Sequence, residues 1–391
     1  MSCTERTLCV ADVLRDQVSG LHLDHEQGKA VAHILACRTG RLGGHLALCD
    51  RCGAKHYAYH SCRDRHCPRC GGLDQRLWAE AQIPHLLPVS YFHLVCTVPV
   101  SLRPFFHGKY RRLALDALFA AVSETILETA ATQGLLPGIL AMLHTWNQQM
   151  GDHPHLHCLV TGGGLKTTTD NKSFVHRRSY LVPLAILQEV FKGKLLSKLQ
   201  ALLREGRTDV PNQSGHERLR DASRRKWNIN IRRPFGGPEQ VVRYFARYVR
   251  KIAISDQRLV DYDGQHVHFK YRDRKDQNRV KTAKLSALTF CKSFLLHVLP
   301  AGFVRIRRYG LLSNRVRKPL LEQCRELLGA DPPLLLAPPG ESRVEALRRI
   351  FAVEPDLCPS CKLGRLIVRA EWRATRLPLD AILAALSPRA P

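Results

Sequence analysis

The chain has 391 residues and carries 60 lysines and arginines against 34 aspartates and glutamates, a formal net charge of +26 at pH 7. An apolar fraction of 45% and an aromatic fraction of 7% exclude wholesale disorder. Without an apolar run of about 18 residues or a signal-peptide pattern at its start, we expect a cytoplasmic protein with no membrane span. The charge favours a polyanionic partner, and nucleic acid is the common one, although non-specific binding of RNA or acidic partners is the alternative.

Apolar periodicity predicts alternating helices and strands along the chain. Helices are predicted over 12–37, 73–87, 110–132, 181–204 and 286–298. Strands are predicted over 91–98, 138–146, 155–160, 227–231 and within 257–285. The second and third of these strands should form a hairpin. We expect a mobile loop over 205–225, a helix that begins at Pro238, and a tail with a Pro-rich spacer from about 313.

The fourteen cysteines are many for a reducing compartment, and their clustering favours metal binding over disulfides. The pairs Cys49/Cys52 and Cys67/Cys70 have C-x2-C spacing, with fourteen residues between the pairs. Two such knuckles supply the four thiolates of a tetrahedral structural zinc site, so we predict that these four bind one Zn²⁺. A set of buried free thiols is the alternative.

Four further nitrogen or sulfur ligands surround this pattern, namely Cys37, His45, Cys62 and His66. In chain order the candidate ligands form four pairs, 37/45, 49/52, 62/66 and 67/70. If alternate pairs share an ion, they form two interleaved zinc sites. The two histidines could equally contact DNA or solvent. Near the C-terminus, Cys358 and Cys361 form half of a zinc knuckle without an evident second half, and Cys324 is a weak candidate to join them.

His155 and His157 lie two residues apart on a predicted strand, so their imidazoles should point to the same face and form a platform for a divalent ion. Gln148 is a candidate third ligand if the hairpin register places it opposite His155. A one-residue slip would turn it to the other face, and an ordinary polar hairpin residue is the alternative.

Tyr244 and Tyr248 are spaced i, i+4, which places both phenols on one face of a helix. Such pairs are usually part of a core, but this segment is strongly basic: residues 216–251 contain eleven lysines and arginines against three acidic residues. Cations stabilise a phenolate, which suits nucleophilic attack on phosphorus. The predicted DNA-binding cations are Arg232, Arg233, Arg243, Arg247, Arg250 and Lys251.

A His-Leu-His strand followed by Tyr-x-x-x-Tyr on a basic helix resembles the two-tyrosine HUH endonucleases. The flanking sequence is similar to the rolling-circle insertion-sequence transposases of the IS91 and ISCR type over about residues 12–318. The similarity rests on CRTGRLGGH (37–45), RHCPRC (65–70), HTWNQ (144–148), HPHLHC (153–158), PFGGPEQ (234–240) and LLHVLP (295–300). It implies an α+β fold with an N-terminal helical and zinc-binding domain (1–87), an HUH-type catalytic domain of antiparallel sheet flanked by helices (88–312), and a C-terminal region with a Cys pair (313–391).

The resemblance also implies a DNA transposase that nicks and joins single strands at mobile-element ends and target. Tyr244 or Tyr248 would form a 5′-phosphotyrosine beside Mg²⁺ or Mn²⁺ on His155, His157 and Gln148, with Zn²⁺ as the structural ion. Such a protein would associate with the bacterial nucleoid when bound to DNA. A plasmid replication initiator or relaxase would share this chemistry, and a non-catalytic zinc regulator would bind DNA without it.

Overall fold

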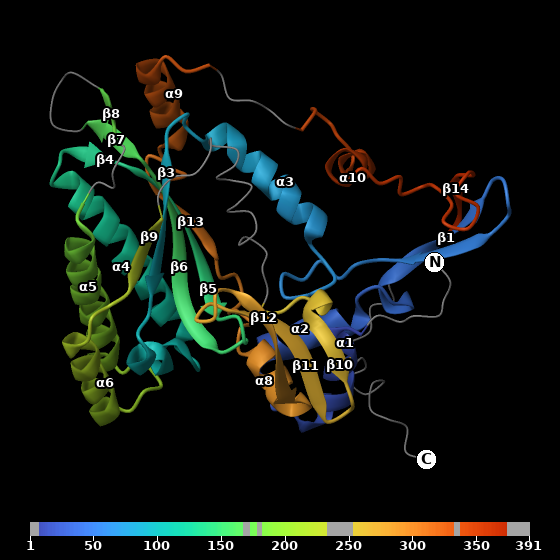
Figure 1. Ribbon diagram of the computed structural model, residues 1–391, viewed down its shortest axis with the longest axis horizontal. Coiled ribbons are helices and arrows are strands. Elements are labelled where there is room, and N and C mark those ends of the chain that lie inside the picture. Colours follow the sequence, from blue (N-terminus) through green and yellow to red (C-terminus); the bar gives the residue numbers. More distant parts are fainter. Residues whose placement is uncertain (1–7, 167–172, 178–181, 233–252, 332–336, 374–391) are drawn as a thin grey trace.

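The computed structural model describes residues 8–166, 173–177, 182–232, 253–331 and 337–373, and it has the expected α+β architecture (Figure 1). Its largest sheet has five antiparallel strands in the order β13-β5-β6-β3-β9. The strands are β3 (Tyr91–Thr97), β5 (Gly138–Trp146), β6 (Asp152–Thr161), β9 (Ile229–Arg232) and β13 (Ile306–Gly310). The predicted hairpin is confirmed as β5 and β6, in the middle of this sheet.

Helices α4 (Arg111–Ala131), α5 (Leu184–Arg204) and α6 (Asn212–Arg224) cover one face of the large sheet (Figure 1). Side chains alternate between the faces of a strand, so Leu156, Cys158 and Val160 of β6 enter the core beneath these helices. The histidines of β6 therefore face the other side.

The predicted mobile loop over 205–225 is wrong, because α6 occupies most of it. Leu219 and Ala222 lie on the buried side of α6 and pack into the same core as α5. Trp227 donates a hydrogen bond from its indole N–H to the carbonyl of Ala222, 2.9 Å away. The helix is stabilised by this narrow apolar side, which a stretch so rich in charge does not reveal by composition.

The opposite face of the sheet is covered at one end only. There α3 (Gly72–Gln82) and α9 (Arg317–Leu328) pack on Leu140, Met142 and Leu159. A small sheet of β4 (Leu135–Leu136), β7 (Gly163–Lys166) and β8 (Phe174–His176) adjoins this end. The other end of the face carries imidazoles and lines a cleft.

A second core joins distant parts of the sequence. It combines α1 (Val10–Gln17), α2 (His25–Ala36) and α8 (Ala287–Leu295) with the antiparallel strands β10 (Leu259–Tyr262), β11 (His266–Asp273) and β12 (Arg279–Ser286). The segment 253–298 therefore packs on the N-terminal helices. The boundaries 87/88 and 312/313 stay predictions, and this packing crosses the first of them.

The C-terminal region also returns to the N-terminal part. β14 (Leu366–Arg373) pairs with β1 (Gly43–Cys49), which pairs with β2 (Lys55–Tyr59), and α10 (Arg343–Phe351) contacts α3. Within the described residues, no helix combines the length and apolar character needed to cross a membrane.

Candidate functional site

Three imidazoles converge on the open end of the large sheet. His155 and His157 come from β6, and His144 comes from β5, directly opposite His155. One ring nitrogen or more from each of the three lies within 4.8 Å of the others, and all three residues are buried. The Nε2 atoms of His155 and His157 are 3.1 Å apart. This cluster is the strongest candidate for a catalytic metal centre in the described chain.

Hydrogen bonds orient the two β6 imidazoles. His155 Nδ1 lies 2.6 Å from the carbonyl oxygen of His153, to which it can only donate. His157 Nδ1 lies 2.8 Å from Nε2 of His93 on β3. Only His155 Nδ1 is fixed as a donor by its carbonyl partner; when His157 Nδ1 donates to His93 Nε2 in the same way, the Nε2 atoms of His155 and His157 both present lone pairs to one point. Outer hydrogen bonds of this kind are typical of metal-binding histidines.

The structure corrects the expected hairpin register, because His144 and not Gln148 lies opposite His155. The side-chain oxygen of Asn147 accepts hydrogen bonds from the backbone N–H groups of Gln149 and Gly151, at 2.9 and 2.8 Å. This turn ends β5 at Trp146. Gln148 consequently lies in the turn, where it lines the cleft.

His297 braces this turn from the side of α8. Its Nε2–H donates to the carbonyl of Met150, 2.9 Å away, and its Nδ1 accepts from the Thr145 hydroxyl at 3.0 Å. The His144 ring stacks on Trp146 with centroids 4.7 Å apart. The LLHVLP segment therefore acts through packing and hydrogen bonds that position β5.

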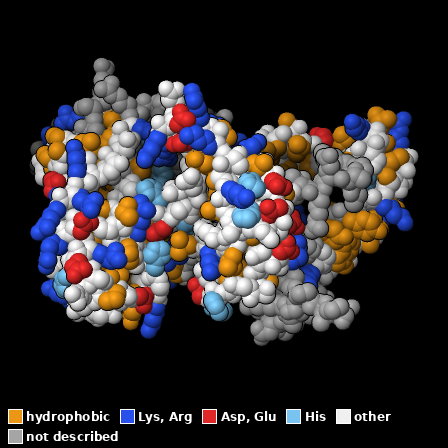
Figure 2. Space-filling model, turned by 60° about the horizontal axis from the view of Figure 1, so that its bottom comes forward, with side chains coloured by type: hydrophobic (Ala, Val, Ile, Leu, Met, Phe, Trp, Pro, Cys, Tyr) orange, Lys and Arg blue, Asp and Glu red, His pale blue; other side chains and the backbone are white. Residues whose placement is uncertain are grey.

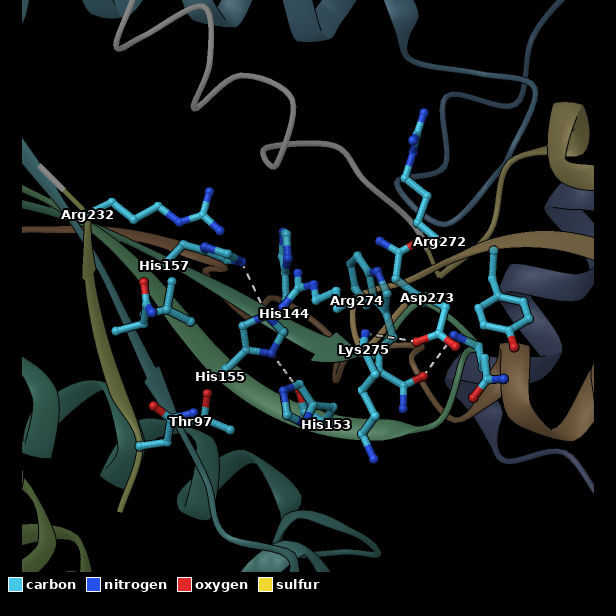
Figure 3. Close-up of a pocket in the computed structure, with 18 of the residues that line it drawn as sticks. Thr97, His144, His153, His155, His157, Arg232, Arg272, Asp273, Arg274 and Lys275 are labelled. Atoms are coloured by element: carbon cyan, nitrogen blue, oxygen red, sulfur yellow. Dashed lines mark hydrogen bonds between the residues drawn. The ribbon is translucent and has the colours of Figure 1, made fainter. Parts of the chain in front are cut away.

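The imidazoles form one wall of a cleft of about 660 Å³. Arg232, at the end of β9, lies on one side of them, and Arg274, in the turn between β11 and β12, lies on the other (Figure 3). Arg272 and Lys275 from the same turn also line the cleft. Lysine and arginine side chains are spread over the face that Figure 2 shows.

Charge in the cleft favours an anion. Asp273 is the single carboxylate among the described residues that line it, and Lys281 lies 2.9 Å from that carboxylate. Burial lowers the pKa of His155 to about 3 and holds the pKa of His157 well below its ordinary value, with nearby imidazoles and Arg274 adding to the effect. Both rings are therefore neutral at pH 7, the form in which imidazole binds metal.

The predicted grouping of Cys49, Cys52, Cys67 and Cys70 around one ion is wrong. The structure separates the two pairs into different four-cysteine clusters, whose sulfurs lie within 4.8 Å of one another in each. One cluster contains Cys37, Cys62, Cys67 and Cys70, and the other contains Cys49, Cys52, Cys358 and Cys361. The pairing of β1 with β14 carries Cys49 away from Cys67 and next to the C-terminal pair.

Neither predicted histidine belongs to these clusters. His66 Nδ1 lies 3.0 Å from the carboxylate of Asp64, and its Nε2 accepts from the backbone N–H of Leu299, so both ring nitrogens are engaged. His45 lies on β1 beside the ring of His60, with centroids 6.5 Å apart. Cys324 lies on the buried side of α9 and does not join Cys358 and Cys361.

Both predicted nucleophiles, Tyr244 and Tyr248, lie outside the described residues. The same is true of the predicted DNA-binding cations Arg233, Arg243, Arg247, Arg250 and Lys251. Arg232 is described, and it lines the cleft. Three cleft features were missed by the sequence reasoning: His144, His93 and the basic turn after β11. The HTWNQ segment contains His144, but its orientation depends on the turn at Asn147.

Comparisons with known proteins agree on one family. Residues 138–319 match a family model described as "Putative transposase", and residues 9–98 match one described as "Transposase zinc-binding domain". "Putative transposase y4qJ" of Sinorhizobium fredii is 36% identical over 380 residues, which cover 92% of this chain and 94% of that protein. "Transposase for insertion sequence element IS801" of Pseudomonas savastanoi pv. phaseolicola is 30% identical over 348 residues, 85% of this chain and 81% of that protein. No solved structure matches the chain.

Proposed function

Because the chain belongs to the IS91-type family of insertion-sequence transposases, we propose that it nicks and rejoins single-stranded DNA at the ends of a mobile element. A tyrosine phenolate attacks the scissile phosphorus, a 5′-phosphotyrosine forms, and the 3′-oxygen leaves and takes up a proton. A 3′-hydroxyl later attacks the phosphotyrosine, restores a phosphodiester and releases the phenol. The number of phosphoester bonds is conserved, so the reaction needs no nucleotide cofactor.

The observation that carries this proposal is the convergence of His144, His155 and His157 in a cleft lined by cations. The Nε2 atoms of His155 and His157 lie 3.1 Å apart, close to the separation of about 3.0 Å between adjacent ligand atoms of an octahedral ion with bonds of about 2.1 Å. A bound Mn²⁺ or Mg²⁺ would supply a Lewis acid for the scissile phosphate. Three imidazole nitrogens suit Mn²⁺ better than Mg²⁺, which prefers oxygen ligands.

Tyr244 and Tyr248 are proposed as the nucleophiles on the similarity of sequence. Arg232 is the last described residue before the segment that contains them, and it lines the cleft. The proposed nucleophiles therefore follow a cleft residue by 12 and 16 positions in the sequence. With two phenols, one could hold a strand end while the other takes part in a second transfer.

We propose structural zinc at Cys37, Cys62, Cys67 and Cys70. All four lie within the matched zinc-binding region. Arg65 ties this site to the catalytic sheet, because its guanidinium donates to the carbonyls of Leu299, Pro300 and Phe303 at 3.2, 3.0 and 2.8 Å. Zinc in this cluster would therefore also hold the segment that precedes β13.

Metal binding by the imidazole cluster can be tested at His93, which contacts His157 and positions its ring. His93→Phe removes the imidazole that contacts His157 Nδ1, so the Mn²⁺ concentration for half-maximal nicking of a single-stranded oligonucleotide should rise about 10- to 100-fold. Saturating Mn²⁺ should restore most of the rate. The measurement is a Mn²⁺ titration of the initial rate, with EDTA as the blank. A non-catalytic DNA-binding regulator predicts no nicking at any Mn²⁺ concentration, and a loss that Mn²⁺ leaves unchanged would contradict the positioning role.

Arg274 should contact DNA phosphate, because it lies beside the imidazoles in a cleft that is predominantly basic. The logarithm of the DNA association constant falls linearly with the logarithm of the salt concentration. We expect Arg274→Ala to make this slope shallower by about 0.7 for single-stranded DNA, the value for one phosphate contact. Fluorescence anisotropy over a salt series measures this slope. Arg204→Ala, an exposed arginine at the end of α5 and outside the cleft, is the matched control. Equal slopes for Arg274→Ala and wild type would place the DNA elsewhere.

A further inference from the structure

We propose that Cys49, Cys52, Cys358 and Cys361 bind a second structural zinc ion, which fastens the C-terminal arm (residues 352–373) to the N-terminal domain. The two pairs are more than 300 positions apart in the sequence, and only the first pair lies in the matched zinc-binding region. The inference is independent of the proposed DNA chemistry.

The sulfur positions fit a tetrahedral zinc site. The Sγ atoms of Cys49 and Cys361 are 3.7 Å apart, and those of Cys52 and Cys358 are also 3.7 Å apart. Four thiolates around one zinc at about 2.3 Å are separated from each other by about 3.8 Å. Sulfurs at this distance are far beyond the bond length of about 2.05 Å in a disulfide.

Backbone N–H groups point at these sulfurs, as a thiolate requires when it is removed from water. The N–H groups of Arg51 and Cys52 both lie 3.4 Å from Cys49 Sγ. On the other side, the N–H of Gly364 lies 3.3 Å from Cys361 Sγ. In each Cys pair the backbone therefore turns around one sulfur, that of Cys49 in the first pair and that of Cys361 in the second. The imidazole of His56 lies 3.6 Å from Cys358 Sγ and can donate to it.

Gly364 shows that the two turns are fitted to each other. A Cβ at this position would lie 2.4 Å from Cys49 Sγ and 2.7 Å from the carboxylate of Asp50. Only glycine lets the C-terminal turn approach the N-terminal sulfur this closely. Asp50 also accepts the backbone N–H of Arg365 at 2.7 Å, which sets the register at the start of β14.

Apart from the strand pairing of β14 with β1 and the contacts of Trp372 with the rings of Tyr57 and Tyr59, the arm has no hydrophobic core to hold it. None of the eight residues of β14 is buried, and within the described residues no member of the β14-β1-β2 sheet belongs to the three hydrophobic cores. Tyr57, Ile367 and Val368 are exposed, and apolar side chains are visible at this end of the molecule in Figure 2. A small sheet without a core generally needs a metal or a disulfide to fold, and here four thiols occupy the place of the core.

The ion pairs between α10 and α3 do not remove this need. Arg343 contacts Asp74 at 2.8 Å, and Arg349 contacts Glu80 at 2.7 Å. Partly exposed pairs of this kind each contribute about 0–1 kcal/mol. They orient α10, which ends at Phe351, before the arm begins.

Zinc content of the purified full-length protein tests the proposal. Elemental analysis should find two zinc ions per chain in the wild type and one in Cys358→Ser/Cys361→Ser. Cys324→Ser removes a buried cysteine outside both clusters and should retain two. Two ions in the double variant, or one in the wild type with free thiols at all four positions by mass spectrometry, would overturn the proposal. Disulfides among the four would overturn it as well.

Amide hydrogen exchange measures the local stability of the arm separately from that of the rest of the fold. In the double variant, amides of β14 and β1 should exchange at least about 10-fold faster, while β5, β6 and α4 keep their protection. Gly364→Ala keeps every ligand and should show the same local effect with weaker zinc retention against a chelator. Gly193→Ala, where a Cβ meets nothing within 4 Å, is its control and should behave as wild type. Unchanged exchange of β14 in both variants would contradict the role of zinc in fastening the arm.

Discussion

His155→Ala and His157→Ala should each lower metal-dependent nicking of single-stranded DNA more than about 100-fold, because loss of a direct ligand should exceed the 10- to 100-fold cost typical of outer-sphere partners. Both imidazoles are buried, neutral at pH 7 and oriented with Nε2 toward a common point. DNA affinity should change little, since it comes mainly from the basic surface. Initial nicking rates and anisotropy on the same oligonucleotide measure the two effects.

The matched control is His176→Ala, an exposed histidine on β8 outside the cleft, which should nick at the wild-type rate. Thermal unfolding of each variant checks that the sheet remains folded. Nicking by His155→Ala or His157→Ala at a near wild-type rate, or nicking by wild type in EDTA, would contradict a metal on these imidazoles.

The double substitution Tyr244→Phe/Tyr248→Phe should abolish the covalent protein–DNA adduct while leaving single-stranded DNA binding intact. Phenylalanine keeps the ring and removes only the hydroxyl, so packing is preserved and the nucleophile is lost. Each single variant should retain part of the nicking activity, because one phenol at i or i+4 remains. Full strand transfer should fall further than nicking, since in the proposed scheme one phenol holds a strand end while the other takes part in a second transfer. Denaturing gels of labelled oligonucleotide measure adduct and transfer together.

Tyr271 is an alternative candidate for the nucleophile, because it is a tyrosine that lines the described cleft. If Tyr271 were the nucleophile, Tyr271→Phe would abolish the adduct and the Tyr244/Tyr248 double variant would retain it. We expect the reverse. This comparison separates a nucleophile assigned by sequence similarity from one suggested by position alone.

Local sequence pattern was sufficient to predict the hairpin that carries His155 and His157. The strict alternation in β6 directs His155 and His157 to one face and Leu156 to the core, and the structure confirms that arrangement. Register was not predictable in the same way, because it depends on where the turn begins. The side chain of Asn147 caps that turn, which moves Gln148 out of the strand and brings His144 opposite His155.

The proposed zinc ligands show what sequence spacing does not determine. C-x2-C spacing identifies a knuckle, but it does not identify the partner knuckle. Cys67 and Cys70 form a cluster with Cys37 and Cys62. The C-x2-C pair that begins at Cys49 forms a cluster with the pair near the C-terminus, 358/361. Strand pairing between β1 and β14 decides this outcome, and such long-range pairing leaves no periodic signal in one sequence. The basic turn between β11 and β12, with Arg274 and Lys275, was not predicted as part of the cleft, because long-range packing brings it beside the imidazoles.

Covalent trapping followed by mapping of the modified residue tests the central claim most directly. Wild-type protein would be incubated with a single-stranded oligonucleotide from an element end and Mn²⁺, then digested and sequenced by mass spectrometry. We predict a phosphodiester between the DNA 5′-phosphate and Tyr244 or Tyr248, formed with Mn²⁺ and absent with EDTA. A phosphate on Tyr271 or on any other residue, or nicking without a covalent adduct, would contradict it.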